Sequence, residues 1–197
     1  MNPIRARILY SLISILVAWC MAWTAGGTFS AGAGGGGTTC SGNYGETAEG
    51  SSNSIASGYT RIQRTAFDCV AEANDATFHI YLKDCNTDAR EIVFLIYADN
   101  EGEPGAKLWE SDPHYWEDST TVGWKTETIP VELSGSYVWI GYHLESGSSS
   151  YYYTSQTPAR TTRTIVNNGT FPDVDESWDT ANDTASEYGH SCYISVP

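Results

Sequence analysis

Polar and apolar residues alternate along several short segments of this chain, which is the spacing expected of half-buried β-strands. The clearest alternation lies in Tyr59–Phe67, Ala76–Leu82 and Gly123–Ile129. These segments are rich in β-branched and aromatic residues, and Gly, Pro, Asp and Ser separate them. They predict strands with one buried face, and in the second strand His79 falls on the face opposite Phe78.

Two further segments, Ile92–Tyr97 and Tyr137–Leu144, are apolar at nearly every position. Strands of this composition are covered on both faces, so we expect them to lie centrally in a sheet. No segment after the first 33 residues has a convincing helical period. The chain therefore predicts an all-β fold, an antiparallel two-sheet jelly-roll sandwich with about four strands in each sheet.

The segment Asp99–Gly105 predicts a turn, with Pro104-Gly105 supplying a fixed φ and then a permissive residue. Asp99, Glu101 and Glu103 place three carboxylates close together, and oxygen ligands at this spacing can hold a structural Ca²⁺ ion. Turns are also rich in acidic residues for backbone reasons alone. Calcium is the only cofactor that the sequence suggests.

The N-terminus has the features of a secretory signal. Arg5 and Arg7 precede the uncharged apolar run Ile8–Trp23, and Ala31-Gly-Ala33 offers small residues for cleavage. An N-terminal apolar helix, a signal peptide of residues 1–33, is the preferred interpretation. A retained anchor or a pilin-like assembly helix is the alternative, and lipid attachment at Cys20 is disfavoured by the bulky Trp19 before it.

The predicted domains follow from composition. Residues 34–51 form a Gly/Ser-rich arm that begins with the glycine run Gly34–Gly37. Residues 52–197 form the β-sandwich domain. After removal of the signal we expect a secreted or cell-surface protein with no membrane segment.

The net charge of −14 restricts the partners. Nucleic acid is excluded as a ligand because the sequence has no cluster of Lys and Arg to displace counterions. Anionic membranes are disfavoured for the same reason. The acidity suits a soluble extracellular protein.

Four cysteines follow the predicted signal, namely Cys40, Cys69, Cys85 and Cys192. An even number in an exported chain indicates two disulfides, with three possible pairings. Cys69 and Cys85 flank one predicted strand, so we favour a bond between them. Cys40 and Cys192 would then join the two ends of the domain.

A series of motifs resembles a known kind of domain. It runs Val93-x3-Tyr97-Ala-Asp-Asn-x-Gly-x-Pro-Gly-x-x-Leu108, then Gly123-Trp124, Gly135-x-Tyr137-x-Trp139-Ile140, Tyr151-Tyr-Tyr153 and Phe171-Pro172. The series is similar to that of bacterial secreted jelly-roll domains that look like carbohydrate-binding modules. The resemblance covers roughly Ser52 to Val196. It implies an extracellular, non-enzymatic β-sandwich and leaves the ligand open. The four cysteines are additional to the pattern.

The sequence contains no catalytic motif. It has no G-x-S-x-G elbow, no phosphate-binding loop and no H-E-x-x-H pair, and its four histidines are scattered. Acidic pairs such as Asp173 and Asp175 resemble glycosidase pairs, but 24 acidic residues produce such pairs by chance. We therefore expect a protein that is not an enzyme.

Aromatic residues supply the sharpest functional hypothesis, because exposed rings stack on the apolar faces of sugars. The candidates in loops or at crowded strand positions are Tyr115, Trp116, Tyr151, Tyr153 and Trp178. Trp124 and Trp139 lie on regular strands, so we expect them in the core. Asn168 and Asn182 begin N-glycosylation acceptor sequences.

Two functions remain open. The preferred one is a structural role, in which a free-standing exported domain self-associates at the cell surface or in an extracellular filament, with its arm adding a strand to a neighbour. The alternative is a carbohydrate-binding module that recognises a polysaccharide through exposed aromatic residues.

Overall fold

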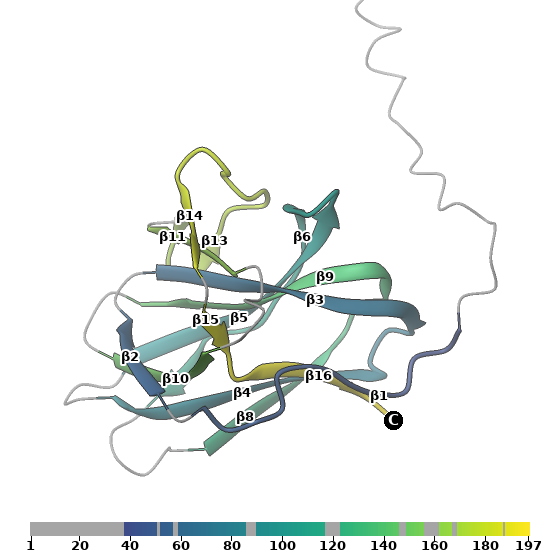
Figure 1. Cartoon of the computed structure of the whole chain (residues 1–197), viewed down its shortest axis with the longest axis horizontal. Coiled ribbons are helices and arrows are strands. Elements are labelled where there is room, and N and C mark those ends of the chain that lie inside the picture. Colours follow the sequence, from purple (N-terminus) through teal and green to yellow (C-terminus); the bar gives the residue numbers. More distant parts are fainter. Residues whose placement is uncertain are drawn as a thin grey trace, which may run out of the picture. The chain divides into compact units, whose positions relative to one another are not determined.

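The computed structural model describes residues 38–50, 52–56, 59–85, 90–116, 123–145, 149–155, 162–166, 169–186 and 188–197 (Figure 1). The predicted signal peptide lies outside these residues. The described chain is all-β and belongs to one compact unit, residues 37–197. None of the described residues belongs to a helix long and apolar enough to cross a bilayer.

The strands follow one another closely along the chain. Their bounds are β1 Gly42–Gly45, β2 Ser52–Ala56, β3 Tyr59–Ala71, β4 Ala76–Cys85, β5 Arg90–Asn100, β6 Glu103–Glu110, β7 His114–Trp116, β8 Gly123–Ile129, β9 Leu133–Leu144, β10 Ser149–Ser155, β11 Thr162–Val166, β12 Gly169–Thr170, β13 Asp173–Val174, β14 Asp183–Ser186, β15 Tyr188–His190 and β16 Cys192–Val196.

Two antiparallel sheets contain all but two of these strands. Sheet 1 has the order β1-β16-β4-β10-β15, and in addition β8 pairs with β4 and β2 with β10. Sheet 2 has the order β14-β11-β3-β9-β5-β6, with β7 also paired to β5. The predicted all-β class and the two antiparallel sheets are confirmed, but each sheet has seven strands where about four were expected. The separate hairpin β12–β13 was not expected.

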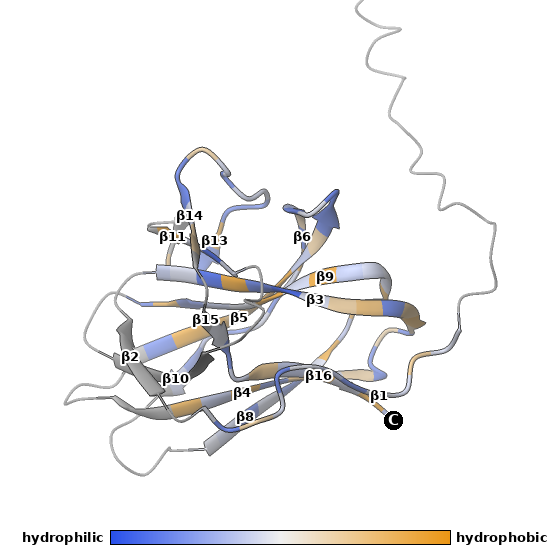
Figure 2. Ribbon diagram, viewed as in Figure 1, coloured by the Kyte–Doolittle hydropathy of each residue, from blue (hydrophilic) through white to orange (hydrophobic). Residues whose placement is uncertain are grey.

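The main core lies between the two sheets, where the alternating residues of both meet (Figure 2). β4 contributes Phe78, Ile80 and Leu82, and all three are buried, as their alternation predicts. Across from them, Phe94 of β5 stacks on Phe78 with ring centroids 4.9 Å apart. Burial of this apolar surface is the main stabilising contribution to the fold.

A second core covers the other face of sheet 2. Val93, Leu95 and Tyr97 alternate with the inward residues of β5 and are fully buried. They pack with Val174 and Trp178, which belong to the polar segment after β11. β5 and β9 are therefore covered on both faces, which confirms the prediction made from their continuous apolar composition.

The hairpin between β5 and β6 is tighter than the sequence suggested. Glu101 and Gly102 form its two-residue loop, with φ of 54° and 97°. Two consecutive positive φ values belong to a type I′ turn, whose twist matches that of the flanking strands. The turn is therefore made by Glu101-Gly102, whereas Pro104 and Gly105, expected in the turn, lie in β6.

The disulfide differs from the favoured pairing. Cys40 is bonded to Cys69, with their Cα atoms 5.1 Å apart. The predicted Cys69–Cys85 and Cys40–Cys192 bonds are therefore wrong. Cys192 is buried in the main core, and the side chain of Cys85 lies outside the described residues. Reasoning from strand flanks failed because Thr39 bridges Val70 in parallel, which brings Cys40 beside Cys69.

The domain also begins earlier than expected. β1 pairs with β16 from Gly42↔Val196 to Gly45↔Tyr193. The compact unit thus starts at Gly37 rather than at the expected boundary of Ser52. The later part of the predicted arm is therefore an edge strand of sheet 1.

Candidate functional site

The outer face of sheet 1 carries aromatic and hydroxyl side chains. Residues directly opposite each other on paired strands share a face. The pairs on the side away from the core include His79↔Tyr193, Tyr81↔Trp124 and Thr77↔Thr128. We define the aromatic face as the following described residues: Thr77, His79, Tyr81, Trp124, Thr126, Thr128, Tyr193 and Ser195.

The rings of the aromatic face form one continuous row across three strands. Trp124 of β8 lies 5.2 Å from Tyr81 of β4 and 5.1 Å from Tyr193 of β16, measured between ring centroids. Both contacts are edge-to-face, at 66° and 75°. Tyr193 in turn stacks on His79 at 4.2 Å with an angle of 3°. Contacts of this kind hold rings in fixed orientations. All four rings are half-buried.

The aromatic face is uncharged at neutral pH. None of its eight residues is Asp, Glu, Lys or Arg, although the chain has 24 acidic residues. His79 Nε2 lies 2.8 Å from Ser195 Oγ. Burial lowers the pKa of His79, so its imidazole is neutral at pH 7. The face therefore presents ring surfaces and hydroxyl groups without a formal charge.

The two tryptophans expected in the core have different positions. Trp139 is fully buried, and its Nε1 donates a hydrogen bond to Asp99 at 2.9 Å. Trp124 is half-buried on the outer face of sheet 1, so the expectation that it belongs to the core is wrong. The sequence signal for this placement is that Trp124, Thr126 and Thr128 occupy alternate positions of β8, whereas the buried Ile129 falls on the opposite face.

The predicted sugar-binding residues do not form one group. Tyr115 lies on β7 at the margin of sheet 2 and is 67% exposed, so its predicted exposure is confirmed. Trp178 is only 6% exposed and belongs to the second core, so its predicted exposure is wrong. Trp116, Tyr151 and Tyr153 lie on described strands, but their side chains are outside the described part of the structure.

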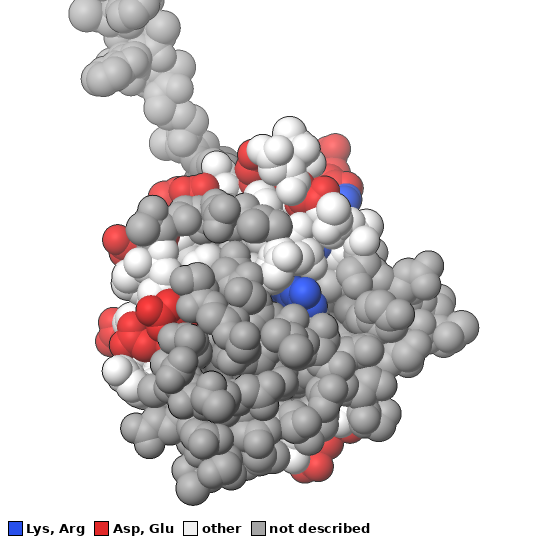
Figure 3. All heavy atoms as spheres, turned by 90° about the vertical axis from the view of Figure 1, so that its left-hand side faces the viewer, with Lys and Arg blue, Asp and Glu red and all other residues white. Residues whose placement is uncertain are grey.

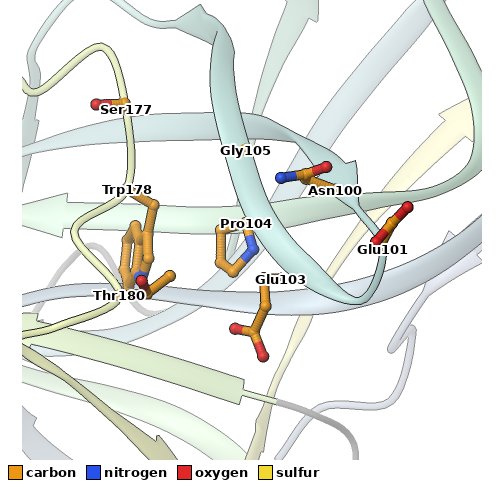
Figure 4. Close-up of a pocket in the computed structure, with 8 residues that line it drawn as sticks. All are labelled: Asn100, Glu101, Glu103, Pro104, Gly105, Ser177, Trp178 and Thr180. Carbon is orange, nitrogen blue, oxygen red and sulfur yellow. The ribbon is translucent and has the colours of Figure 1, made fainter.

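Trp178 still forms one wall of a depression (Figure 4). Its Nε1 donates a hydrogen bond to Asp183 at 2.7 Å, and its ring meets Tyr97 edge-on at 5.6 Å. The opposite wall is the β5–β6 hairpin, including Pro104 and Glu101. The volume of the depression is about 550 Å³, within the range of small-ligand sites.

Two of the three predicted calcium ligands are used in other contacts. Asp99 accepts two hydrogen bonds from Arg64, at 2.6 and 2.9 Å, and this guanidinium lowers the pKa of the Asp99 carboxyl. Glu103 forms an ion pair with Arg163 at 2.5 Å, and Glu101 is exposed at the turn. The described residues contain no group of three His, Cys, Asp or Glu side chains placed to hold a metal ion.

The described histidines occupy four separate environments. His143 Nδ1 lies 2.7 Å from Thr60 Oγ1 beneath the ring of Phe171, and burial lowers its pKa to about 4. Burial and nearby Arg61 lower the pKa of His190 to about 3. His114 contacts the Glu127 carboxylate. Among the described residues, no histidine lies with both a nucleophile and an exposed acid in the way that a hydrolytic site requires.

The long sheet edges are protected among the described residues. On β8, Lys125 lies opposite Ile80 and Glu127 lies opposite Phe78, on the side of sheet 1 that faces the core. Charged groups therefore occupy the core-facing side of this edge strand. β6 is covered by the segment after β13, through Lys107 N–H to Glu176 O at 2.8 Å. Inward-pointing charges and covered edges oppose pairing with another chain.

Several acidic side chains are exposed among the described residues. Figure 3 shows acidic side chains in separate groups on one face, with little basic surface between them.

Asn182, one of the two predicted glycosylation acceptors, is exposed, and its amide donates to Asp179. Asn168, the other predicted glycosylation acceptor, lies outside the described residues.

Comparison with protein-family models, with curated proteins and with solved structures gave no match. The function is therefore inferred from the residues of this chain and their geometry.

Proposed function

We propose that this protein is a non-catalytic, secreted carbohydrate-binding module whose aromatic face contacts a neutral polysaccharide. The single observation that carries the proposal is the continuous row of four rings on an uncharged sheet face. The jelly-roll relationship and the cleaved leader are parts of the same proposal, and the disulfide is consistent with an extracellular location.

The chemistry of the face suits a sugar chain. The C–H groups of a pyranose ring present an apolar surface that packs against aromatic rings. Hydroxyls of Thr126, Thr128 and Ser195 lie on the same face and both donate and accept hydrogen bonds. Tyr and Trp provide large contact areas and lose little conformational freedom on binding.

The lack of charge favours neutral polysaccharides. A uronic acid or sulfated chain would need Lys or Arg nearby, and none of the eight described residues of the aromatic face is either. The net charge of −14 would also repel an anionic chain. A neutral glucan, mannan or xylan meets no such repulsion.

Self-association is the second candidate function, and the same face favours it. A half-buried aromatic and uncharged surface on an acidic protein is also suited to contact a second copy. Strand addition at a sheet edge is disfavoured by the charged β8 edge and the covered β6 edge. If copies associate, we expect the contact on the aromatic face rather than along these two edges.

Two measurements on the full-length protein separate these functions. Co-sedimentation with a panel of insoluble neutral polysaccharides measures binding, and analytical ultracentrifugation without sugar measures association. A monomer that is retained on one or more polysaccharides supports the proposal. A concentration-dependent oligomer that ignores the whole panel supports self-association and overturns it.

A further inference from the structure

We infer that the aromatic face binds one polysaccharide chain at a time, separated from its neighbours, so that the ligand is a soluble or swollen polysaccharide rather than a crystalline one. This inference rests on the proposed function and deepens it. It follows from two features of sheet 1, namely the angles between the rings and a row of polar side chains beside them.

The rings of the aromatic face do not share a plane. Trp124 is inclined by 66° to Tyr81 and by 75° to Tyr193. Tyr193 and His79 are parallel within 3°, but their centroids are only 4.2 Å apart, so each ring covers one face of the other. A flat surface that stacks on Trp124 therefore meets neither of the two tyrosines face-on.

Polar side chains cross the same face of sheet 1 beside the rings. Their strands, β8, β4, β16 and β1, are neighbours in one layer (Figure 1). We define the polar row as the four residues that lie opposite one another across these strands, Thr128, Thr77, Ser195 and Asn43. Ser195 follows Tyr193 by two positions on β16, a distance of about 6.6 Å along a strand. The polar row is therefore next to the rings.

The polar row offers hydrogen bonds to a ligand. Thr128 and Asn43, at its two ends, are exposed. In its middle, Ser195 Oγ lies 2.8 Å from His79 Nε2, which connects the row to the rings. Hydroxyl and amide groups both donate and accept hydrogen bonds, as sugar hydroxyls do. The row therefore suits the hydroxyl edge of a sugar chain whose apolar face packs against the rings.

A separated chain fits both features better than a crystal surface does. In a crystalline polysaccharide the chains form flat layers, and hydroxyl groups at their edges are hydrogen-bonded to neighbouring chains. Such a surface stacks on only some of the rings and leaves the polar row poorly paired, which weakens binding. A separated chain twists and presents its faces and its hydroxyl edges together, so it contacts rings of different orientation and the polar row.

The test measures depletion isotherms of the full-length protein on cellulose, chitin and mannan, each in a crystalline and a swollen form. Dissociation constants are compared rather than capacities, because the capacity depends on the accessible area. We expect the swollen form of at least one polysaccharide to bind roughly tenfold or more tightly than its crystalline form. The matching soluble hexasaccharide, which is cellohexaose, chitohexaose or mannohexaose, should displace the bound protein.

The inference and the proposed function fail separately in this experiment. If a crystalline form binds within about tenfold of its swollen form, or if the hexasaccharide does not displace the protein, the inference is overturned and the proposed function stands. Absence of binding to every form overturns both.

Two variants test the polar row. Asn43→Ala and Thr128→Val each remove hydrogen-bonding groups from one exposed end of it. One lost hydrogen bond corresponds to about three- to tenfold in affinity, so we expect each variant to bind the hexasaccharide more weakly by this factor, with an unchanged melting temperature. Asn182→Ala is the matched control, because Asn182 is exposed and lies outside sheet 1. If either variant binds as tightly as Asn182→Ala, the inference is overturned.

Discussion

Removal of the Cys40–Cys69 disulfide should destabilise the domain strongly, and the size of the effect follows from its loop. The two cysteines are separated by 29 positions. Closing a loop of this length lowers the entropy of the unfolded chain, which corresponds to about 3.6 kcal/mol of stability at 25 °C. Domains of this kind are stable by only about 5–15 kcal/mol. The bond is therefore expected to supply a large fraction of the total.

The assay is urea unfolding of the wild type and of the double variant Cys40→Ser/Cys69→Ser. Both cysteines are replaced because a single leftover thiol could exchange with another cysteine. The expected result is a loss of roughly 3–4 kcal/mol in the free energy of unfolding. Peptide mapping without reductant should recover Cys40 linked to Cys69. A loss below about 1 kcal/mol, or a linked peptide containing Cys69 and Cys85, would refute the reasoning.

Two further predictions concern backbone packing and acid stability. Gly141→Ala should destabilise the fold strongly, because a Cβ at this position would overlap Arg61 O and lie 2.7 Å from Ile62 Cα. Circular dichroism should show a melting temperature lowered by many degrees or no folded signal, and a near-wild-type melt would contradict the close approach of β3 and β9. His143 and His190 have lowered pKa values, about 4 and about 3, and stay neutral when folded. The unfolded chain gains their protons below about pH 6.5, so stability is complete above that pH and falls as the pH drops towards 4. Urea unfolding should show a loss of roughly 4 kcal/mol between pH 7 and pH 5, and a constant stability over this interval would be inconsistent with buried neutral imidazoles.

The strands were largely predictable because burial dictates their residue pattern. Alternation located β4 and β8, and the continuous apolar runs of β5 and β9 correctly indicated cover on both faces. The residues that cover the outer face of sheet 2 were not predictable. Val174 and Trp178 lie in a long polar segment without a regular period, and their burial depends on contacts with a sheet far away in the sequence.

The candidate site was only partly predictable, for a related reason. A loop position suggests exposure, but Trp178 is buried. A strand position suggests burial, but Trp124 lies on the outer face of sheet 1. The row of rings joins β8, β4 and β16, and their adjacency follows from strand order, which local patterns do not determine. The predicted disulfide pairing was wrong for the same reason, because the path of Thr38–Cys40 beside Val70 is a tertiary feature.

The most direct test of the central claim is affinity gel electrophoresis of three proteins through soluble neutral polysaccharides. The wild type is compared with Trp124→Ala and with Tyr115→Ala, a control that removes an exposed ring outside the aromatic face. The account predicts that at least one polysaccharide retards the wild type and Tyr115→Ala equally, whereas Trp124→Ala loses at least tenfold in affinity while remaining folded. Equal retardation of all three proteins, or none with any neutral polysaccharide, would contradict it.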